Sequence, residues 1–166
     1  MNCPACGAPM HLIAGSDSLA CDFCKSVHVV EKNDDGVALL DETPEQMCPV
    51  CAIPLWSATL DGVAMHYCKH CRGMLIPMEP FVGLVETMRC LHPGSQIPSP
   101  ADPAELRRKV DCPLCHHRMD AHFYYGGGSV VIDGCDACSL NWLDAGELMR
   151  VVHAPHHAEA EEAERY

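Results

Sequence analysis

The chain has 166 residues, a formal net charge of −12 and only 5% aromatic side chains. Aromatic residues are few, and 13 prolines and 12 glycines interrupt the apolar runs, which argues against one large conventional core. The acidic charge disfavours autonomous nucleic-acid binding. The count of 13 cysteines is far above average usage and indicates either disulfides or thiolate–metal sites.

The redox compartment decides between these two uses of cysteine. The N-terminal residues 1–4 have no basic stretch followed by an apolar one, so no secretory signal is visible. No run approaches 18 apolar residues, so we expect no membrane span and no membrane partner. We therefore expect a cytoplasmic protein, in which metal binding is favoured over disulfides.

A repeated cysteine pattern is the main feature of the sequence. Pairs of C-x-x-C recur with intervening gaps of 14, 16 and 19 residues, at or next to the spacing of a four-cysteine zinc site, and each first pair reads CPxC. The predicted ligands are Cys3, Cys6, Cys21 and Cys24 for the first site, Cys48, Cys51, Cys68 and Cys71 for the second, and Cys112, Cys115, Cys135 and Cys138 for the third.

Small units of this kind need a metal to fold. A segment of about 25–30 residues buries too little apolar surface to offset its chain entropy, whereas two C-x-x-C turns close a tetrahedral shell around one Zn²⁺. The segment between the turns is expected to be a hairpin, and Asp61-Gly62 is a strong turn signal in the second unit. The pattern predicts three Zn²⁺ sites, although spacing alone does not separate zinc from iron.

The stretch from Cys112 to His116 also reads C-x-x-C-H, the attachment signature of a c-type haem. Because this pair has its second half at Cys135 and Cys138, and the sister units lack the histidine, we interpret it as one third of the zinc repeat.

The predicted fold class is a small, metal-stapled, mostly β protein of three tandem zinc ribbons, with short helices after the second and third. In chain order we expect ribbon 1 (1–30), an acidic linker (31–43), ribbon 2 with a C-terminal helix (44–92), a Pro-rich linker (93–104), ribbon 3 with a capping helix (105–152) and a polar tail (153–166). The Pro-rich linker, with its Gly and Ser, is typical of a flexible joint.

Two helices are indicated outside the hairpins. In the second unit, an apolar stripe at helical spacing follows Pro80 and comprises Phe81, Leu84, Val85, Met88 and Leu91. Such a stripe is usually core, or it docks a neighbouring ribbon or another chain. In the third unit, Asp144 and Glu147 resemble a capping box, which predicts a helix from Ala145, and Trp142 either packs that helix on the ribbon or anchors a partner.

The C-terminal unit resembles the TFIIB-type zinc-ribbon family of bacteria, whose members continue from the last C-x-x-C into a W-L-D-x-G-E-L segment. The matching residues are Cys112, Cys115, Cys135, Cys138, Trp142, Leu143, Asp144, Gly146, Glu147 and Leu148. The middle unit matches in part, and the first only in its metal site. The resemblance implies a zinc-ribbon fold with a structural metal, and it implies no enzymatic activity.

Three functions remain open. The sequence favours a non-enzymatic zinc-binding module for protein–protein interaction, or an accessory subunit of a larger assembly. The alternatives are a nucleic-acid-binding ribbon protein of transcription or RNA metabolism, and an iron-bearing accessory subunit of a redox complex. Cys90 has no partner pair and is interpreted as an incidental exposed thiol. No catalytic constellation is recognisable.

Overall fold

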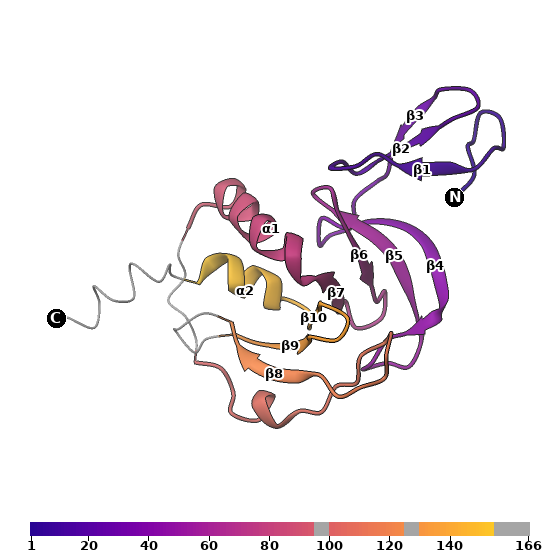
Figure 1. Ribbon diagram of the computed structural model, residues 1–166. Helices are drawn as coiled ribbons and strands as arrows, with labels where there is room; N and C mark the ends of the chain where they lie inside the picture. The colour runs from indigo at the N-terminus through magenta and orange to yellow at the C-terminus, as the bar shows by residue number, and fades with distance from the viewer. Residues whose placement is uncertain (95–99, 125–129, 155–166) are drawn as a thin grey trace.

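The computed structural model describes residues 1–94, 100–124 and 130–154, which form two antiparallel sheets and two α-helices (Figure 1). The N-terminal sheet has the order β1-β2-β3, with strands β1 (Met10–Leu12), β2 (Ser18–Cys21) and β3 (Val27–Val29). The second sheet has the order β4-β5-β6-β7-β10-β9-β8. Its strands are β4 (Ala38–Met47), β5 (Pro54–Leu60), β6 (Val63–Tyr67), β7 (Met74–Pro77), β8 (Asp120–Phe123), β9 (Val131–Cys135) and β10 (Leu140–Leu143).

The helices follow the second and third ribbons, as predicted. They are α1 (Met78–Leu91) and α2 (Glu147–His153), and a short 3₁₀ turn, η1 (Glu105–Arg107), precedes ribbon 3. The predicted fold class is confirmed: hairpins that carry cysteine clusters, with short helices after two of them. Neither helix of the described residues has the length and apolarity needed to cross a membrane.

Ribbons 2 and 3 share the seven-stranded sheet. Strands β7 and β10 pair antiparallel at its centre, with Leu75 opposite Trp142. Each of these two residues is the fourth after the last cysteine of its ribbon, so the pairing joins equivalent strands about a local pseudo-twofold axis. The sequence did not predict this pairing, because hydrophobic patterning along one strand does not reveal which distant strand it pairs with. Residues 95–99 of the predicted Pro-rich linker and residues 155–166 of the predicted polar tail lie outside the described residues.

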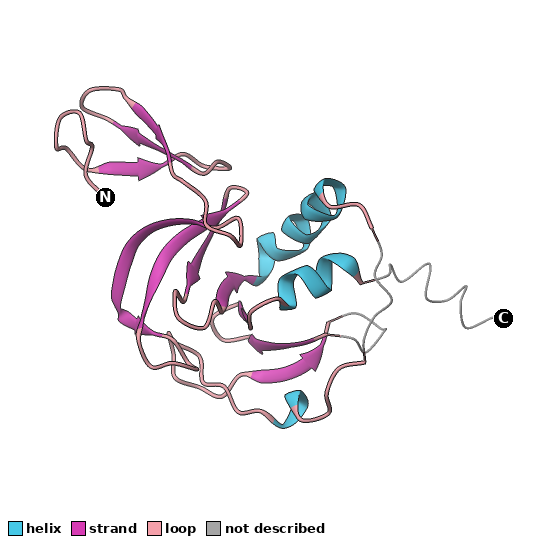
Figure 2. Cartoon of the chain, turned by 180° about the vertical axis from the view of Figure 1, so that it is seen from behind, coloured by secondary structure: helices cyan, strands magenta, loops and turns pink. Residues whose placement is uncertain are grey.

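The apolar stripe of α1 docks on the neighbouring ribbon. Phe81, Leu84, Val85 and Met88 are buried in one cluster with residues of both ribbons, whereas Leu91 remains 61% exposed. The two helices lie side by side within the curve of the sheet (Figure 2). Arg89 of α1 donates hydrogen bonds to the carbonyls of Val151 and Val152 (3.0 Å each), which satisfies acceptors left open at the end of α2.

The acidic segment 31–43 is bound to ribbon 2 along much of its length. Strand β4 begins inside it at Ala38 and pairs with β5. Asp35 accepts hydrogen bonds from the Tyr67 hydroxyl (2.5 Å) and from Arg72 Nε (2.9 Å). Thr43 also lies in β4, and its Oγ1 donates a hydrogen bond to the Leu55 carbonyl at 2.6 Å.

Ribbon 1 contacts the rest of the chain at two polar points: the Met1 ammonium pairs with Asp41 of β4, and Asp17 lies at the tip of the ribbon 1 hairpin. The Asp17 carboxylate accepts hydrogen bonds from Thr59 Oγ1 (2.5 Å) and the Gly62 N–H (2.9 Å), and Lys32 pairs with it at 2.8 Å. The expected Asp61-Gly62 turn forms, with positive φ at both residues, and a side chain at Gly62 would meet the Gly15 carbonyl carbon at 2.4 Å. Burial raises the pKa of Asp17, but these hydrogen bonds bring it below its usual value.

Substituting Asp17→Asn is expected to release ribbon 1 from the hairpin of β5 and β6 without unfolding it. The amide keeps the shape but removes the charge that Lys32 meets, and the expected loss is about 1–3 kcal/mol of contact free energy. Limited proteolysis within 31–37 and ¹⁵N relaxation of ribbon 1 would measure the release. Asp22→Asn is the matched control, because the Asp22 side chain is 84% exposed, and equal effects of the two variants would contradict the role of Asp17.

Candidate metal centres and a surface groove

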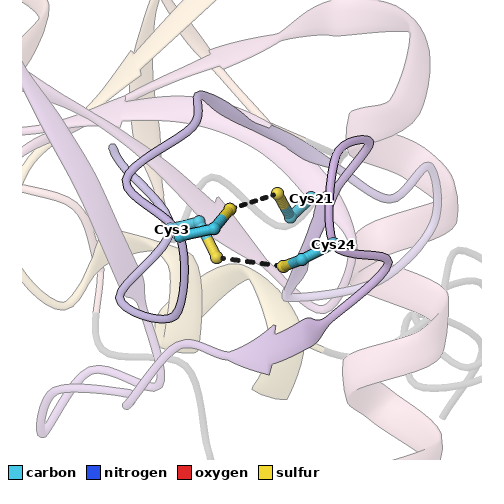
Figure 3. Close-up of side chains that lie close together, drawn as sticks. Cys3, Cys21 and Cys24 are labelled. Atoms are coloured by element: carbon cyan, nitrogen blue, oxygen red, sulfur yellow. Dashed lines mark hydrogen bonds between the residues drawn. The ribbon is translucent and has the colours of Figure 1, made fainter.

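Each ribbon brings its four predicted ligands together. Within each group all four sulfur atoms lie within 4.8 Å of one another. Figure 3 shows this for the first group, in which Cys3, Cys21 and Cys24 turn toward a common centre. The groups are Cys3, Cys6, Cys21 and Cys24; Cys48, Cys51, Cys68 and Cys71; and Cys112, Cys115, Cys135 and Cys138.

The sulfur–sulfur distances fit a metal shell and not disulfides. The sulfurs of Cys6 and Cys21 lie 3.5 Å apart, and those of Cys115 and Cys135 lie 3.6 Å apart. A disulfide requires about 2.05 Å, whereas a tetrahedron of Zn–S bonds near 2.3 Å places its sulfurs about 3.8 Å apart. All 13 cysteines are free thiols in the structure. The three clusters are therefore suited to three zinc ions.

The backbone of each knuckle follows one pattern. The residue after each second cysteine has a positive φ, and in five of the knuckles its N–H donates to the carbonyl of the first cysteine at 2.8–2.9 Å. In the sixth, the Ser139 N–H donates to the Asp136 carbonyl at 3.3 Å. The residues in this position are Gly7, Lys25, Ala52, Arg72, His116 and Ser139. His116 is thus a turn residue of the third zinc knuckle, which accounts for the C-x-x-C-H string without haem.

The three sites differ in their surroundings. Cys6 and Cys24 of the first site are exposed, whereas sites 2 and 3 border one shared apolar cluster. That cluster contains Leu75 and Trp142, the pair at the centre of the joined sheet. Trp142 is fully buried, so it packs the two ribbons together and does not anchor a partner.

Polar groups next to the sulfurs were not identified in the sequence. The Ser26 hydroxyl lies 3.3 Å from Cys3 Sγ and 3.0 Å from Cys24 Sγ, and its hydrogen bond is the largest of several that lower the pKa of the Cys3 thiol to about 5. This favours the thiolate form that a metal requires. His70 Nδ1 lies 3.3 Å from Cys51 Sγ. The described histidines belong to none of the three ligand clusters.

The segment that follows the last cysteine of ribbon 3 organises an ion-pair network. Arg108 pairs with both Asp133 and Asp144, and Trp142 Nε1 donates to Asp144 Oδ1 at 3.1 Å. The Asp144 N–H donates to Glu147 Oε2 at 2.7 Å, as in a capping box, and burial raises the pKa of Glu147 to about 7. The helix begins at Glu147 and not at the predicted Ala145, because Gly146 has a φ of 84°.

A hollow of about 620 Å³ is bordered by α1, α2 and residues 32–36. Its apolar lining includes Leu60, Met74, Met88, Leu91 and Met149. Its charged lining is mixed: Asp61 pairs with Lys32, Asp35 pairs with Arg72, and Asp34 is a further carboxylate. Methionine side chains adapt to irregular partners, so a lining of this kind suits the binding of an apolar side chain. We call this feature the methionine groove.

One known protein family matches part of this chain. Residues 47–79 match the profile of the TFIIB-type zinc ribbon, a family described as a transcription factor zinc-finger. The match covers the knuckles and the hairpin of ribbon 2. It confirms the resemblance to the TFIIB-type zinc ribbon, but on the middle ribbon and not on the C-terminal ribbon, where the sequence resemblance was expected to be closest. No curated protein and no solved structure was found to match the chain.

Proposed function

We propose that the protein is a non-enzymatic, zinc-stapled binding module that recognises a protein partner. The observation that carries the proposal is the closed ligand set: four thiolates at each site fill the tetrahedral shell of zinc. A catalytic zinc keeps a position for water or substrate, and these sites offer none. The metal then has a structural task, and function resides on the surface that it holds in place.

The methionine groove is the surface that we assign to the partner. It is lined by flexible apolar side chains, and of the three carboxylates beside them Asp35 pairs with Arg72 and Asp61 with Lys32, while Asp34 is a further acidic residue of the rim. Since the whole chain carries −12, we expect an occupant of opposite charge, namely a protein segment with one apolar anchor flanked by basic residues. A binding role through this groove requires no chemistry at the zinc sites.

A second candidate is nucleic-acid binding in transcription. It is favoured by the family description, a transcription factor zinc-finger. The balance of 11 basic against 23 acidic residues counts against it. An iron-bearing redox subunit is the third candidate, and metal analysis separates it at once, since the zinc form is colourless and contains three zinc ions per chain.

The partner is tested by placing a photo-crosslinking residue at position 91 or at position 82 of the full chain in its native host. Leu91 lines the methionine groove, whereas Val82 is a 45% exposed residue of the same helix outside it. We expect one discrete protein adduct from position 91, none from position 82, and loss of that adduct when Asp34 is changed to Lys. Equal labelling from both positions would contradict the proposal.

The nucleic-acid alternative is tested on the purified zinc-loaded protein. Labelled single- and double-stranded DNA and RNA, at about 50 mM salt, are expected to show no saturable binding up to about 10 µM protein. Saturable binding that weakens steeply as salt rises would replace the protein partner by a nucleic acid.

A further inference from the structure

Strand β3 of ribbon 1 is the structural equivalent of the two strands that join ribbons 2 and 3. All three strands follow directly after the second C-x-x-C of their ribbon. His28 is the fourth residue after its last cysteine, as are Leu75 and Trp142 in β7 and β10. In ribbons 2 and 3 these equivalent strands pair with each other, whereas β3 has only β2 as a neighbour among the described residues.

The hydrogen bonds around β7 show which of its residues bond to β6 and which bond to β10. The Cys68 N–H donates to the Gly73 carbonyl, and His66 lies opposite Leu75. Because hydrogen-bonded pairs alternate in an antiparallel ladder, the main-chain groups of Leu75 face β6 and those of its neighbours face β10. The pseudo-twofold axis therefore passes between Leu75 and Trp142 at a pair without main-chain hydrogen bonds.

The hydrogen-bonded residues of β3 alternate in the same way, but among the described residues no strand pairs with its outer edge. The Cys21 N–H donates to the Ser26 carbonyl, the Val30 N–H donates to the Asp17 carbonyl, and His28 lies opposite Leu19. By the same alternation, His28 bonds toward β2, and the N–H and C=O groups of Val27 and Val29 face outward. Figure 1 shows β3 on the side of ribbon 1 away from the seven-stranded sheet.

The free edge of β3 is apolar, and none of its three residues is a proline or one of the charged residues Asp, Glu, Lys and Arg. Val27 is 59% exposed and Val29 is 79% exposed. By contrast the edge strand β4 contains Asp41, Glu42, Glu45 and a proline. Charges and proline are the devices with which sheets prevent edge-to-edge association. An exposed edge without them is suited to receive another strand.

The edge sequence is complementary to itself. In an antiparallel pairing of two β3 strands about His28, Val27 of one chain lies opposite Val29 of the other. Lys25 and Glu31, which bracket the strand, are both exposed. In this pairing Lys25 of one chain lies opposite Glu31 of the other, so opposite charges meet at each end of the contact. We propose that two copies of this chain associate through β3 in this register, which repeats between chains the junction that β7 and β10 form within one chain.

The proposal is tested by the mass of the zinc-loaded full chain in sedimentation equilibrium. The wild-type chain is expected to be a dimer of twice 18.1 kDa at about 100 µM. Val29→Lys is expected to give a monomer, with dissociation at least about tenfold easier. Val50→Lys is the matched control, since Val50 is a 53% exposed valine outside β3, and it should leave the dimer intact. A wild-type monomer, or a dimer in Val29→Lys, would overturn the proposal.

Charge reversal tests the register independently of any loss of folding. Lys25→Glu and Glu31→Lys alone place like charges opposite each other and should each weaken the dimer, whereas the double variant restores opposite charges and should recover it. Zinc content should stay at three per chain throughout. Failure of the double variant to recover the dimer would rule out this register.

Discussion

Changing Cys112 and Cys135 to serine is expected to unfold ribbon 2 together with ribbon 3, although the second zinc site keeps all its ligands. Zinc supplies about 10–16 kcal/mol of folding free energy to a site of this kind. Without it, β9 and β10 lose the framework that holds Trp142 against Leu75, and the cluster shared by sites 2 and 3 opens. Loss of dispersion in the NMR signals of Leu75 and Phe81 would measure the effect.

The matched variant removes zinc from ribbon 1 instead. With Cys3 and Cys21 changed to serine, zinc should fall from three to two per chain while the signals of Leu75 and Phe81 stay unchanged, because ribbon 1 has its own sheet. Cys90→Ser should change neither quantity, since Cys90 is exposed and outside the clusters. If ribbon 2 kept its native spectrum after loss of the third site, the ribbons would fold independently.

Adding a single methyl group at Gly73 is expected to destabilise the joined sheet. A Cβ at this position would lie 2.2 Å from ring carbon Cζ2 of Trp142, and that ring is fully buried and hydrogen-bonded to Asp144. The ring cannot withdraw without breaking its contacts in the shared cluster. Overpacking of this kind costs about 1–3 kcal/mol, which thermal or denaturant unfolding of the zinc-loaded protein would show.

Gly83→Ala provides the opposite result with the same chemical change. Gly83 lies inside α1 and is exposed, and apart from its chain neighbours and the backbone of its own helix no atom lies within 4 Å of the position that an added methyl group would take. Alanine in a helix interior is favoured over glycine, so we expect a gain of about 0.5–1 kcal/mol. Destabilisation by both substitutions would show that the contact with Trp142 is not what makes Gly73 sensitive.

Most of the correct predictions rest on patterns among residues that are close together in the sequence. Two C-x-x-C pairs can converge only if the segment between them reverses direction, so the cysteine spacing alone indicates both hairpin and metal site. The Asp61-Gly62 turn likewise follows from short-range backbone preferences. The stripe from Phe81 to Met88 identified a buried face, but several partners could have covered it, and the pattern did not distinguish them.

The features that were not predicted depend on contacts between distant residues. Nothing in the sequence around Leu75 or Trp142 indicates that the two residues pair, yet their strands are neighbours in the sheet. Arg108 meets Asp133 and Asp144 only because the chain before ribbon 3 returns along its surface. The helix start was misplaced because Asp144 and Glu147 give the same signature whether Gly146 is helical or left-handed.

The central position of β7 has a consequence for synthesis on the ribosome. Ribbon 2 emerges complete with its zinc ligands, but its strand β7 and the apolar face of α1 have no cover until β10 and α2 are made. At ~5–20 residues per second, the interval from Leu91 to Leu143 lasts roughly 3–10 seconds. During that time a nascent chain exposes an unpaired strand edge next to an apolar helix, and on a polysome the β10 of a neighbouring chain can reach it first. Exchange of ribbon 3 between chains is therefore the expected misfolding product of this fold.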